Sequence, residues 1–329
     1  MIEILANLLY GLVQGTMLIL IAPAIIGLLN WTEARLQRRQ GAGIIQPYRD
    51  LTKLLAKPAV RPRSTSFVFA ATPYVLFAAY GTLAFMLPAI SQHTLMRGDL
   101  ILIIYVLGLA RFTLSLAGLD AGASLGGLGA SREMFLHFLT EIGLAMLVVA
   151  LAIRWQTTDL TIIMESHWSM GLLGSLYEPE LVLLSLAMFV LVVFEAERRP
   201  VDNSATHLEL TMAQKAVTLE FAGRDLALVD WAEAIKLTAL LTIAGHLFIP
   251  LPLPLVLSPL GSGPAMLVTA TLGWALRVGL LILGLGIVEV YLPKRRLRTL
   301  PQLALTSIAL SGTAILYALT LVNLGSAIR

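Results

Sequence analysis

The chain has 329 residues, of which 57% are hydrophobic and 13% are charged, and its mean hydropathy is +0.84. A composition this apolar excludes a single soluble domain and predicts a protein that crosses a membrane several times. The net charge of +3 reflects basic residues gathered in loops, so it gives no reason to expect nucleic-acid binding.

Eight stretches are long and apolar enough to cross a bilayer, for which about 20 mostly apolar residues are needed. They lie near residues 4–29, 66–90, 100–118, 133–153, 180–196, 228–250, 264–291 and 302–323. We therefore expect an all-α, polytopic membrane protein in which residues 1–329 form a single integral membrane domain. The first stretch lacks a basic leader and a small-residue cleavage site, so we expect it to be a retained span.

The first loop, residues 31–64, is longer than a connection requires and strongly basic. Its middle carries apolar residues at helical spacing opposite polar ones, which predicts an amphipathic helix at the membrane surface. The apolar face holds Ile44, Ile45, Tyr48, Leu51, Leu54 and Leu55. Two interpretations stay open: the basic residues only anchor the loop to lipid, or the loop forms a docking surface or a cavity wall.

The glycine-rich stretch GASLGGLGAS, residues 122–131, lacks the Lys-Ser/Thr ending of a phosphate-binding loop, and we expect a flexible connection. In the span that follows, Glu133, His137 and Glu141 recur every four residues, which predicts that they share one helical face. Glu141 lies roughly 13 Å into that span at 1.5 Å per residue. It is interpreted either as a proton relay or as a structural partner of Arg111 or Lys236.

A second long loop, residues 196–229, is acidic and begins within VFEAERRPVDNSATHLEL, residues 193–210. Carboxylates within a bilayer cost about 3 kcal/mol each on insertion scales, and they commonly mark ion pathways or paired charges. A hydrated loop accounts for Glu209 and Asp225. It does not account for Glu195 and Glu233, which are embedded in apolar segments.

The basic residues predict the orientation, because Lys and Arg accumulate in cytoplasmic loops. Seventeen of the 23 Lys and Arg residues lie in the loops after the first, third, fifth and seventh predicted spans. We therefore expect a multi-pass protein of the cytoplasmic membrane with both termini outside.

The chain contains no cysteine, which bears on its chemistry. Iron–sulfur clusters and nickel–iron sites are held largely by Cys thiolates, and no His, Asp and Glu residues have the spacing of a zinc site. We expect no metal, flavin or other cofactor in this chain.

Four further stretches carry a family pattern. They are RRQGAGIIQPYRDLTKLL (38–55), GDLILIIYVLGLARFTLSLAGLDAG (98–122), GASREMFLHFLTEIGLAML (129–147) and EFAG (220–223). Together they resemble the membrane-arm subunit of respiratory complex I that adjoins the quinone site (NADH dehydrogenase subunit 1). The likeness is closer to its counterpart in group 4 nickel–iron hydrogenases of the formate hydrogenlyase type.

The acidic stretch matches this family only in part. Glu195, Arg198, Pro200 and Asp202 keep the complex I pattern, whereas Ala205 and His207 stand where the family usually has carboxylates. In the first loop, Ala42 replaces the proline that is usual in the hydrogenase version. The thinned acidic run and the close match of residues 98–147 to the hydrogenase pattern favour the hydrogenase branch over complex I itself, although Ala42 departs from that branch.

The resemblance implies a subunit that docks a redox arm and couples electron transfer to proton or sodium movement through buried carboxylates. The residues implied for the ion pathway are Glu133, His137, Glu141, Glu195, Asp202, His207, Glu209, Glu220, Glu233 and Lys236. Those implied for docking or the cavity are Arg38, Arg39, Arg49, Asp50, Lys53, Arg111, Arg132 and Arg198.

The implied partners are hydrogenase-like large and small peripheral subunits, antiporter-like membrane subunits and membrane lipid. Iron–sulfur clusters, and in the hydrogenase branch a nickel–iron site, would belong to those peripheral subunits, and the catalysed reaction would be theirs. Two alternatives stay open. One is the quinone-site subunit of NADH:quinone oxidoreductase, since the sequence neither indicates nor excludes a quinone; the other is a stand-alone secondary transporter, for which no internal repeat is evident.

Overall fold

The structure is a computed structural model, and it describes residues 2–91, 94–202, 212–249, 264–293 and 299–327. Nearly all of these residues are helical, and within them the only β-type pairing is an isolated bridge between Asp99 and Asp159. The predicted all-α fold is therefore confirmed. The helices are α1 (Ile2–Leu36), α2 (Gln46–Leu55), α3 (Phe67–Met86), α4 (Leu100–Asp120), α5 (Ser124–Trp155), α6 (Leu160–Tyr177), α7 (Pro179–Glu195), α8 (Gln214–Thr218), α9 (Gly223–Phe248), α11 (Pro264–Tyr291) and α12 (Leu300–Ala327).

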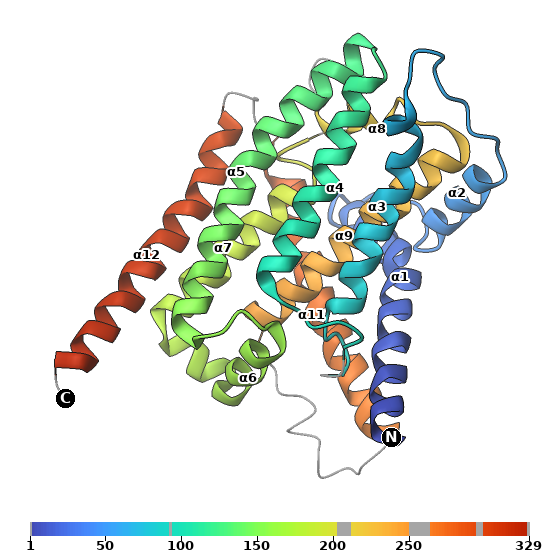
Figure 1. The fold of residues 1–329 in the computed structure, drawn as a ribbon. Coiled ribbons are helices and arrows are strands. Elements are labelled where there is room, and N and C mark those ends of the chain that lie inside the picture. Colours follow the sequence, from blue (N-terminus) through green and yellow to red (C-terminus); the bar gives the residue numbers. More distant parts are fainter. Residues whose placement is uncertain (1, 92–93, 203–211, 250–263, 294–298, 328–329) are drawn as a thin grey trace.

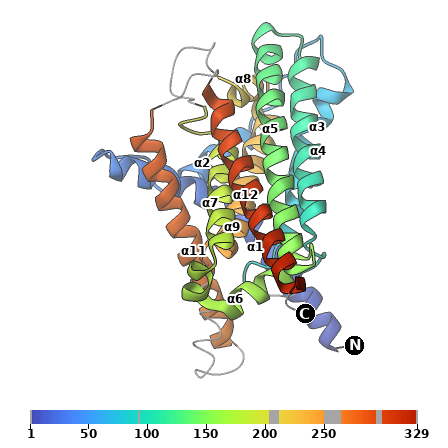
Figure 2. The ribbon, with the colours of Figure 1, turned by 90° about the vertical axis from the view of Figure 1, so that its left-hand side faces the viewer.

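The long helices run roughly side by side and form one bundle (Figure 1). The short helices α2 and α8 lie toward one end, which we call the α2 end, and α6 lies at the other, which we call the α6 end (Figures 1 and 2). Helix α1 begins and α12 finishes at the α6 end. Long loops therefore gather at the α2 end.

The predicted count of about eight spans is not confirmed. Each predicted stretch is helical in its described part, but only six described helices are long and apolar enough to cross a membrane: α1, α3, α4, α5, α11 and α12. Helix α7 has only 17 residues, and the first half of α9 carries five charged side chains, from Arg224 to Lys236. The charged side chains that suggest a functional role for α7 and α9 also lower the mean hydropathy of these two helices.

The amphipathic helix expected in the first loop is confirmed as α2. Pro47 lies in its first turn, where a missing backbone N–H costs nothing. Leu51 is buried, and the Tyr48 hydroxyl donates a hydrogen bond of 2.6 Å to the Leu20 carbonyl of α1. Helix α2 thus packs on α1 and α9 and forms part of the protein wall.

The flexible loop expected at residues 122–131 was wrong, because α5 begins at Ser124. Only Gly122 and Ala123 keep a loop conformation, Gly122 with a φ of +67° in the left-handed region after α4 and Ala123 with an extended backbone. The other glycines allow close packing: a Cβ at Gly129 would lie 2.7 Å from the Ala216 Cβ of α8. The stretch is helical because its small residues let α5 approach its neighbours.

One hydrophobic core passes through α1, α3, α4, α5, α7, α9 and α11. Phe69 of α3 stacks on Phe221, which precedes α9, with ring centroids 4.3 Å apart. The Trp231 Nε1 of α9 donates a hydrogen bond of 2.9 Å to the Ile19 carbonyl of α1. Helix α9 is thus held centrally, which fixes the charged residues on its first half.

A test of this packing is the substitution Gly27→Ala on α1. A Cβ there would lie 2.0 Å from the Ile44 carbonyl oxygen, so the loop that carries α2 would have to shift. We expect a loss of about 1–3 kcal/mol, typical of overpacking, seen as a lower thermal unfolding temperature of the purified protein in detergent. Gly43→Ala is the matched control, because no atom lies within 4 Å of its added Cβ. Equal stability of both variants would contradict the described contact.

Candidate functional site

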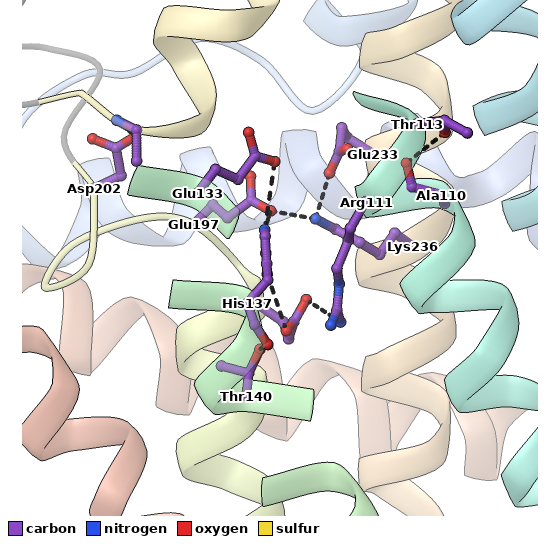
Figure 3. A network of polar contacts seen from close by, with 12 residues as sticks. Ala110, Arg111, Thr113, Glu133, His137, Thr140, Glu197, Asp202, Glu233 and Lys236 are labelled. Atoms are coloured by element: carbon purple, nitrogen blue, oxygen red, sulfur yellow. Dashed lines mark hydrogen bonds and ion pairs between the residues drawn. The ribbon is translucent and has the colours of Figure 1, made fainter. Parts of the chain in front are cut away.

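Seven ionisable side chains from four helices meet inside the bundle and form what we call the charge network (Figure 3). Its members are Arg111 of α4, Glu133 and His137 of α5, Glu195 at the end of α7, Glu197 just beyond it, and Glu233 and Lys236 of α9. Arg111, Glu133, Glu195 and Lys236 are each no more than 3% exposed. The network is therefore largely shielded from water.

The shortest link between α4 and α7 is an ion pair. Arg111 Nη2 lies 2.7 Å from Glu195 Oε2, and both side chains are buried. Because α7 ends at Glu195, this carboxylate closes the helix and at the same time neutralises a guanidinium inside the apolar part of α4. A buried charge of either sign costs several kcal/mol unless it is paired in this way.

His137 connects the two halves of the network. Its Nδ1 lies 3.8 Å from Glu195 Oε1, and its Nε2 lies 3.4 Å from Glu133 Oε1 and 3.9 Å from Glu197 Oε1. Glu133 is one helical turn away on α5, so the i, i+4 spacing read from the sequence brings these two side chains together. An imidazole among three carboxylates can accept a proton from one side and return it on the other.

Lys236 links the network to α9. Its Nζ lies 2.6 Å from Glu233 Oε2, one turn earlier, and it also contacts Glu197. Figure 3 shows Glu197 between His137 and Lys236. The chain of contacts from Arg111 to Glu233 is therefore continuous.

The network contains more acidic than basic groups, so the number of protons bound to its carboxylates can change. Four carboxylates face two permanent cations and one histidine. Burial raises the pKa of the Glu197 carboxyl to about 8, while the nearby Lys236 opposes that rise. A carboxyl with such a pKa loads and releases a proton close to neutral pH.

A cavity of about 430 Å³ lies beside the network, between α1, α2, α9 and the chain that follows α7. Eight acidic and five basic residues are among its 23 lining residues, so more than half of the residues around it are charged. Glu195, Glu197, Glu233 and Lys236 belong to both the cavity and the network. The cavity therefore offers water and ions direct access to the buried charges.

Several polar lining residues of this cavity were missed as site residues from the sequence, among them Asn30, Glu33, Arg199 and Glu289. Arg198 donates a 2.6 Å hydrogen bond to Asn30 and lies 3.3 Å from Glu289, while Arg199 pairs with Glu33. Glu289 sits inside an apolar helix, the same signal that singled out Glu195 and Glu233, so it could have been found. No comparable pattern in the sequence singled out Glu33 or Asn30.

Glu141 does not join the charge network. It lies in a separate groove of about 430 Å³ between α4 and α5, lined mainly by apolar residues such as Tyr105 and Phe138. An α-helix turns 3.6 residues per turn, so a side chain eight positions after Glu133 is rotated by about 80° from it. Neither expected structural partner pairs with Glu141, because Arg111 pairs with Glu195 and Lys236 with Glu197 and Glu233.

The remaining predicted residues fall into three groups. Asp50, Arg39, Arg198 and Asp202 line the cavity, and Asp202 Oδ2 accepts a hydrogen bond of 3.1 Å from the Ala213 amide. Arg132 donates to the Met212 carbonyl and Glu220 lies against Gly126, both near α8. Arg38, Arg49 and Lys53 are exposed at the surface of the first loop. His207 and Glu209 lie outside the described residues.

Three comparisons with known proteins agree with this geometry. The family model "NADH dehydrogenase" matches residues 10–320. Formate hydrogenlyase subunit 4 of Escherichia coli K12 is 32% identical over 251 residues, covering 74% of this chain and 78% of that protein. Hydrogenase-4 component C of the same organism is 33% identical over 243 residues, covering 73% and 75% of the two chains.

The fold also matches a solved structure. A chain of the membrane-bound sulfane sulfur reductase, an archaeal respiratory membrane complex, superposes with a TM-score of 0.80 over 95% of this chain and 99% of that one, at 18% identity. The helical architecture and the charge network together define a membrane subunit of the complex I-like type. The chain belongs to the NADH dehydrogenase family, and the resemblance read from its motifs is confirmed.

Removing Arg111 tests whether the network depends on its ion pair with Glu195. Arg111→Met strands a buried carboxylate, so we expect a loss of about 3–5 kcal/mol, measured as a lower unfolding temperature in detergent. The double variant Arg111→Met/Glu195→Leu removes both charges and should recover most of that loss. Lys53→Met, in an exposed 3.8 Å pair with Asp50, is the control and should change stability by about 0–1 kcal/mol. A double variant as unstable as the single one would contradict the pairing.

Proposed function

We propose that this chain is the docking and ion-coupling subunit of a hydrogenase-type, complex I-like membrane complex, in which electron transfer in partner subunits drives proton or sodium movement. The observation that carries the proposal is the continuity between the charged cavity and the buried charge network. The catalysed redox chemistry belongs to partners, because the chain has no cysteine to hold a cluster.

The orientation that we propose places the α2 end in the cytoplasm and both termini outside, in the cytoplasmic membrane. Of the 23 Lys and Arg residues, 17 lie in the loops that this orientation makes cytoplasmic. In this arrangement residues 1–329 form one integral membrane domain with two cytoplasmic loops, 31–64 and 196–229. The cavity then opens toward the side where a peripheral arm would bind.

The ion path begins in the cavity and enters the network at Glu197 and Lys236. A proton reaching Glu197 is within reach of His137, which also faces Glu133 and Glu195. When a partner's redox change alters the charge near the cavity, the proton content of Glu197 changes with it. Asp202 and Glu220, together with His207 and Glu209 of the second loop, would supply ions to this entrance.

Glu141 is the exit residue in this proposal. His137 lies one turn before it on α5, and water can bridge gaps that are too wide for a direct hydrogen bond. The groove that holds Glu141 is on the outer face of α4 and α5, where Tyr105 is 71% and Phe138 61% exposed. A carboxylate there would be costly beside lipid alone. An antiporter-like membrane subunit covering this groove would receive the ion.

Docking of hydrogenase-like large and small subunits is assigned to the α2 end. Arg38, Arg39, Arg49 and Lys53 are exposed there. The iron–sulfur clusters, and a nickel–iron site if one is retained, would be carried by those subunits. The alternative function, a quinone site in NADH:quinone oxidoreductase, is less well supported, because 13 of the 23 cavity-lining residues are charged and a quinone ring and tail prefer apolar walls.

The coupling role is tested by Glu141→Gln, which keeps the size of the side chain but cannot ionise. In the complex reconstituted into vesicles, we expect assembly and electron transfer to artificial acceptors to be largely unchanged and the ion gradient to be abolished. Redox turnover and the gradient are measured together. The control is Glu165→Gln, which changes an exposed carboxyl on α6. Normal pumping in an assembled Glu141→Gln complex would refute the relay, and loss of assembly would indicate a structural role.

The docking role is tested by reversing charge in the first loop, with Arg38→Glu and Arg39→Glu combined. Repulsion should then detach the peripheral arm, while the membrane subunits still insert and co-purify. The readout is the stoichiometry of peripheral subunits and metal in the purified complex. Arg97→Glu, an exposed arginine at the α6 end, should leave the arm bound. Unchanged co-purification in the double variant would contradict docking at this loop.

A further inference from the structure

Arg277 is a buried cation that the charge network does not use. It lies in the middle of α11 and is 2% exposed, and its Nε and Nη1 have no hydrogen-bond partner among the described residues. No described carboxylate forms an ion pair with it, and the sequence from residue 249 to 263, which precedes α11, contains no acidic residue. An unpaired guanidinium inside a spanning helix is costly and calls for a functional reason.

Aromatic and imidazole rings surround this cation near the α6 end. The Arg277 Cζ lies 4.9 Å from the centroid of the Trp168 ring of α6, and that ring meets His246 of α9 edge to face at 5.5 Å. The His246 Nε2 lies 2.9 Å from the Pro88 carbonyl, so this nitrogen carries the hydrogen. Helix α11 approaches closely because residue 245 is a glycine: a Cβ there would lie 3.3 Å from the Arg277 Cβ.

A line of buried polar side chains on α9 leads from the wall of the charged cavity to this cluster. Thr238, Thr242 and His246 lie one turn apart on one face of α9, and each is 1% exposed. The Thr238 hydroxyl donates a hydrogen bond of 2.8 Å to the carbonyl of Ala234, which lines the cavity beside the charge network. Thr242 Oγ1 accepts a hydrogen bond of 3.1 Å from Trp274 Nε1 of α11. Ten residues from Lys236 to His246 span roughly 15 Å at 1.5 Å per residue. Hydroxyl and imidazole groups in such a line could conduct protons onward from the network.

We propose that Arg277, capped by Trp168, is an electrostatic seal that stops cations from leaving the charge network along α9 toward the α6 end. A fixed positive charge buried beside the line of polar groups repels protons and metal cations, as rings of basic side chains do in selective pores. The seal rests on the proposed function, because it matters only if ions enter the network. It would force ions to leave sideways toward Glu141 and would prevent a short circuit across the membrane.

The experiment measures passive proton leak, with no electron donor present. The complex is reconstituted into vesicles that contain a pH-sensitive dye and potassium, and valinomycin imposes an inside-negative potential. At an effective dielectric constant of about 20, removing a charge about 10 Å from the path lowers the barrier enough for a leak increase of about tenfold. We therefore expect Arg277→Gln to acidify the vesicle interior about ten times faster than the unmodified complex.

Two further variants test whether the leak depends on the charge of residue 277, on the shape of its side chain or on its position in the bundle. Arg277→Lys can carry the same charge, but a buried lysine loses its proton more readily than an arginine, so its leak should lie between the unmodified rate and that of Arg277→Gln. Arg97→Gln removes an exposed arginine from the same end of the bundle and should leave the leak unchanged. Should Arg277→Gln fail to assemble, Arg277→Met is measured in its place. It should assemble, because removing an unpaired buried charge is neutral or stabilising.

Several results would overturn the seal. They are an unchanged leak in an assembled Arg277→Gln or Arg277→Met complex, a faster leak in the Lys variant than in the Gln variant, or failure of both the Gln and Met variants to assemble. Because no turnover takes place, the leak does not depend on coupling. Failure of the proposed function would appear separately, as normal pumping in the Glu141→Gln complex.

Discussion

The buried ion pair between Arg111 and Glu195 is the interaction on which the site depends. Each charge would cost several kcal/mol alone inside the bundle, and each is stable because the other lies 2.7 Å away. The pair joins α4 to the end of α7, and the chain that leaves α7 then carries Glu197 to His137 and Lys236. The position of the whole network therefore follows from one contact between helices that are distant in sequence.

The two ends of the bundle differ in how their charged side chains are paired. At the α2 end, acidic and basic side chains line an accessible cavity, and Arg198 and Arg199 are balanced by Glu289 and Glu33. Toward the α6 end, Arg277 is held against Trp168 with no carboxylate paired to it among the described residues. In the proposed function this asymmetry would matter, because a route open at both ends would dissipate an ion gradient.

Side chains of helix α5 face two different regions of the protein. Glu133 and His137 face the network, whereas Glu141 faces the outer groove beside α4. An α-helix has 3.6 residues per turn, so side chains spaced at i, i+4 and i+8 point in successively different directions around the helix axis. The same geometry keeps Glu141 out of ion-pair distance of Arg111 and turns its carboxylate toward the groove between α4 and α5.

The all-α membrane class, the family and the amphipathic helix α2 could be predicted from the sequence, as could Glu195, Glu233 and His137 as candidate site residues. These follow from hydropathy, motif and spacing, which are local properties. The tertiary structure alone decided that Arg111 pairs with Glu195, that Glu141 turns away, that residues 124–131 are helical, and that Glu33 and Glu289 complete the cavity. Partners of a buried charge are chosen by the packing of distant helices, and that packing depends on close contacts such as Gly129 against Ala216, which no local pattern encodes.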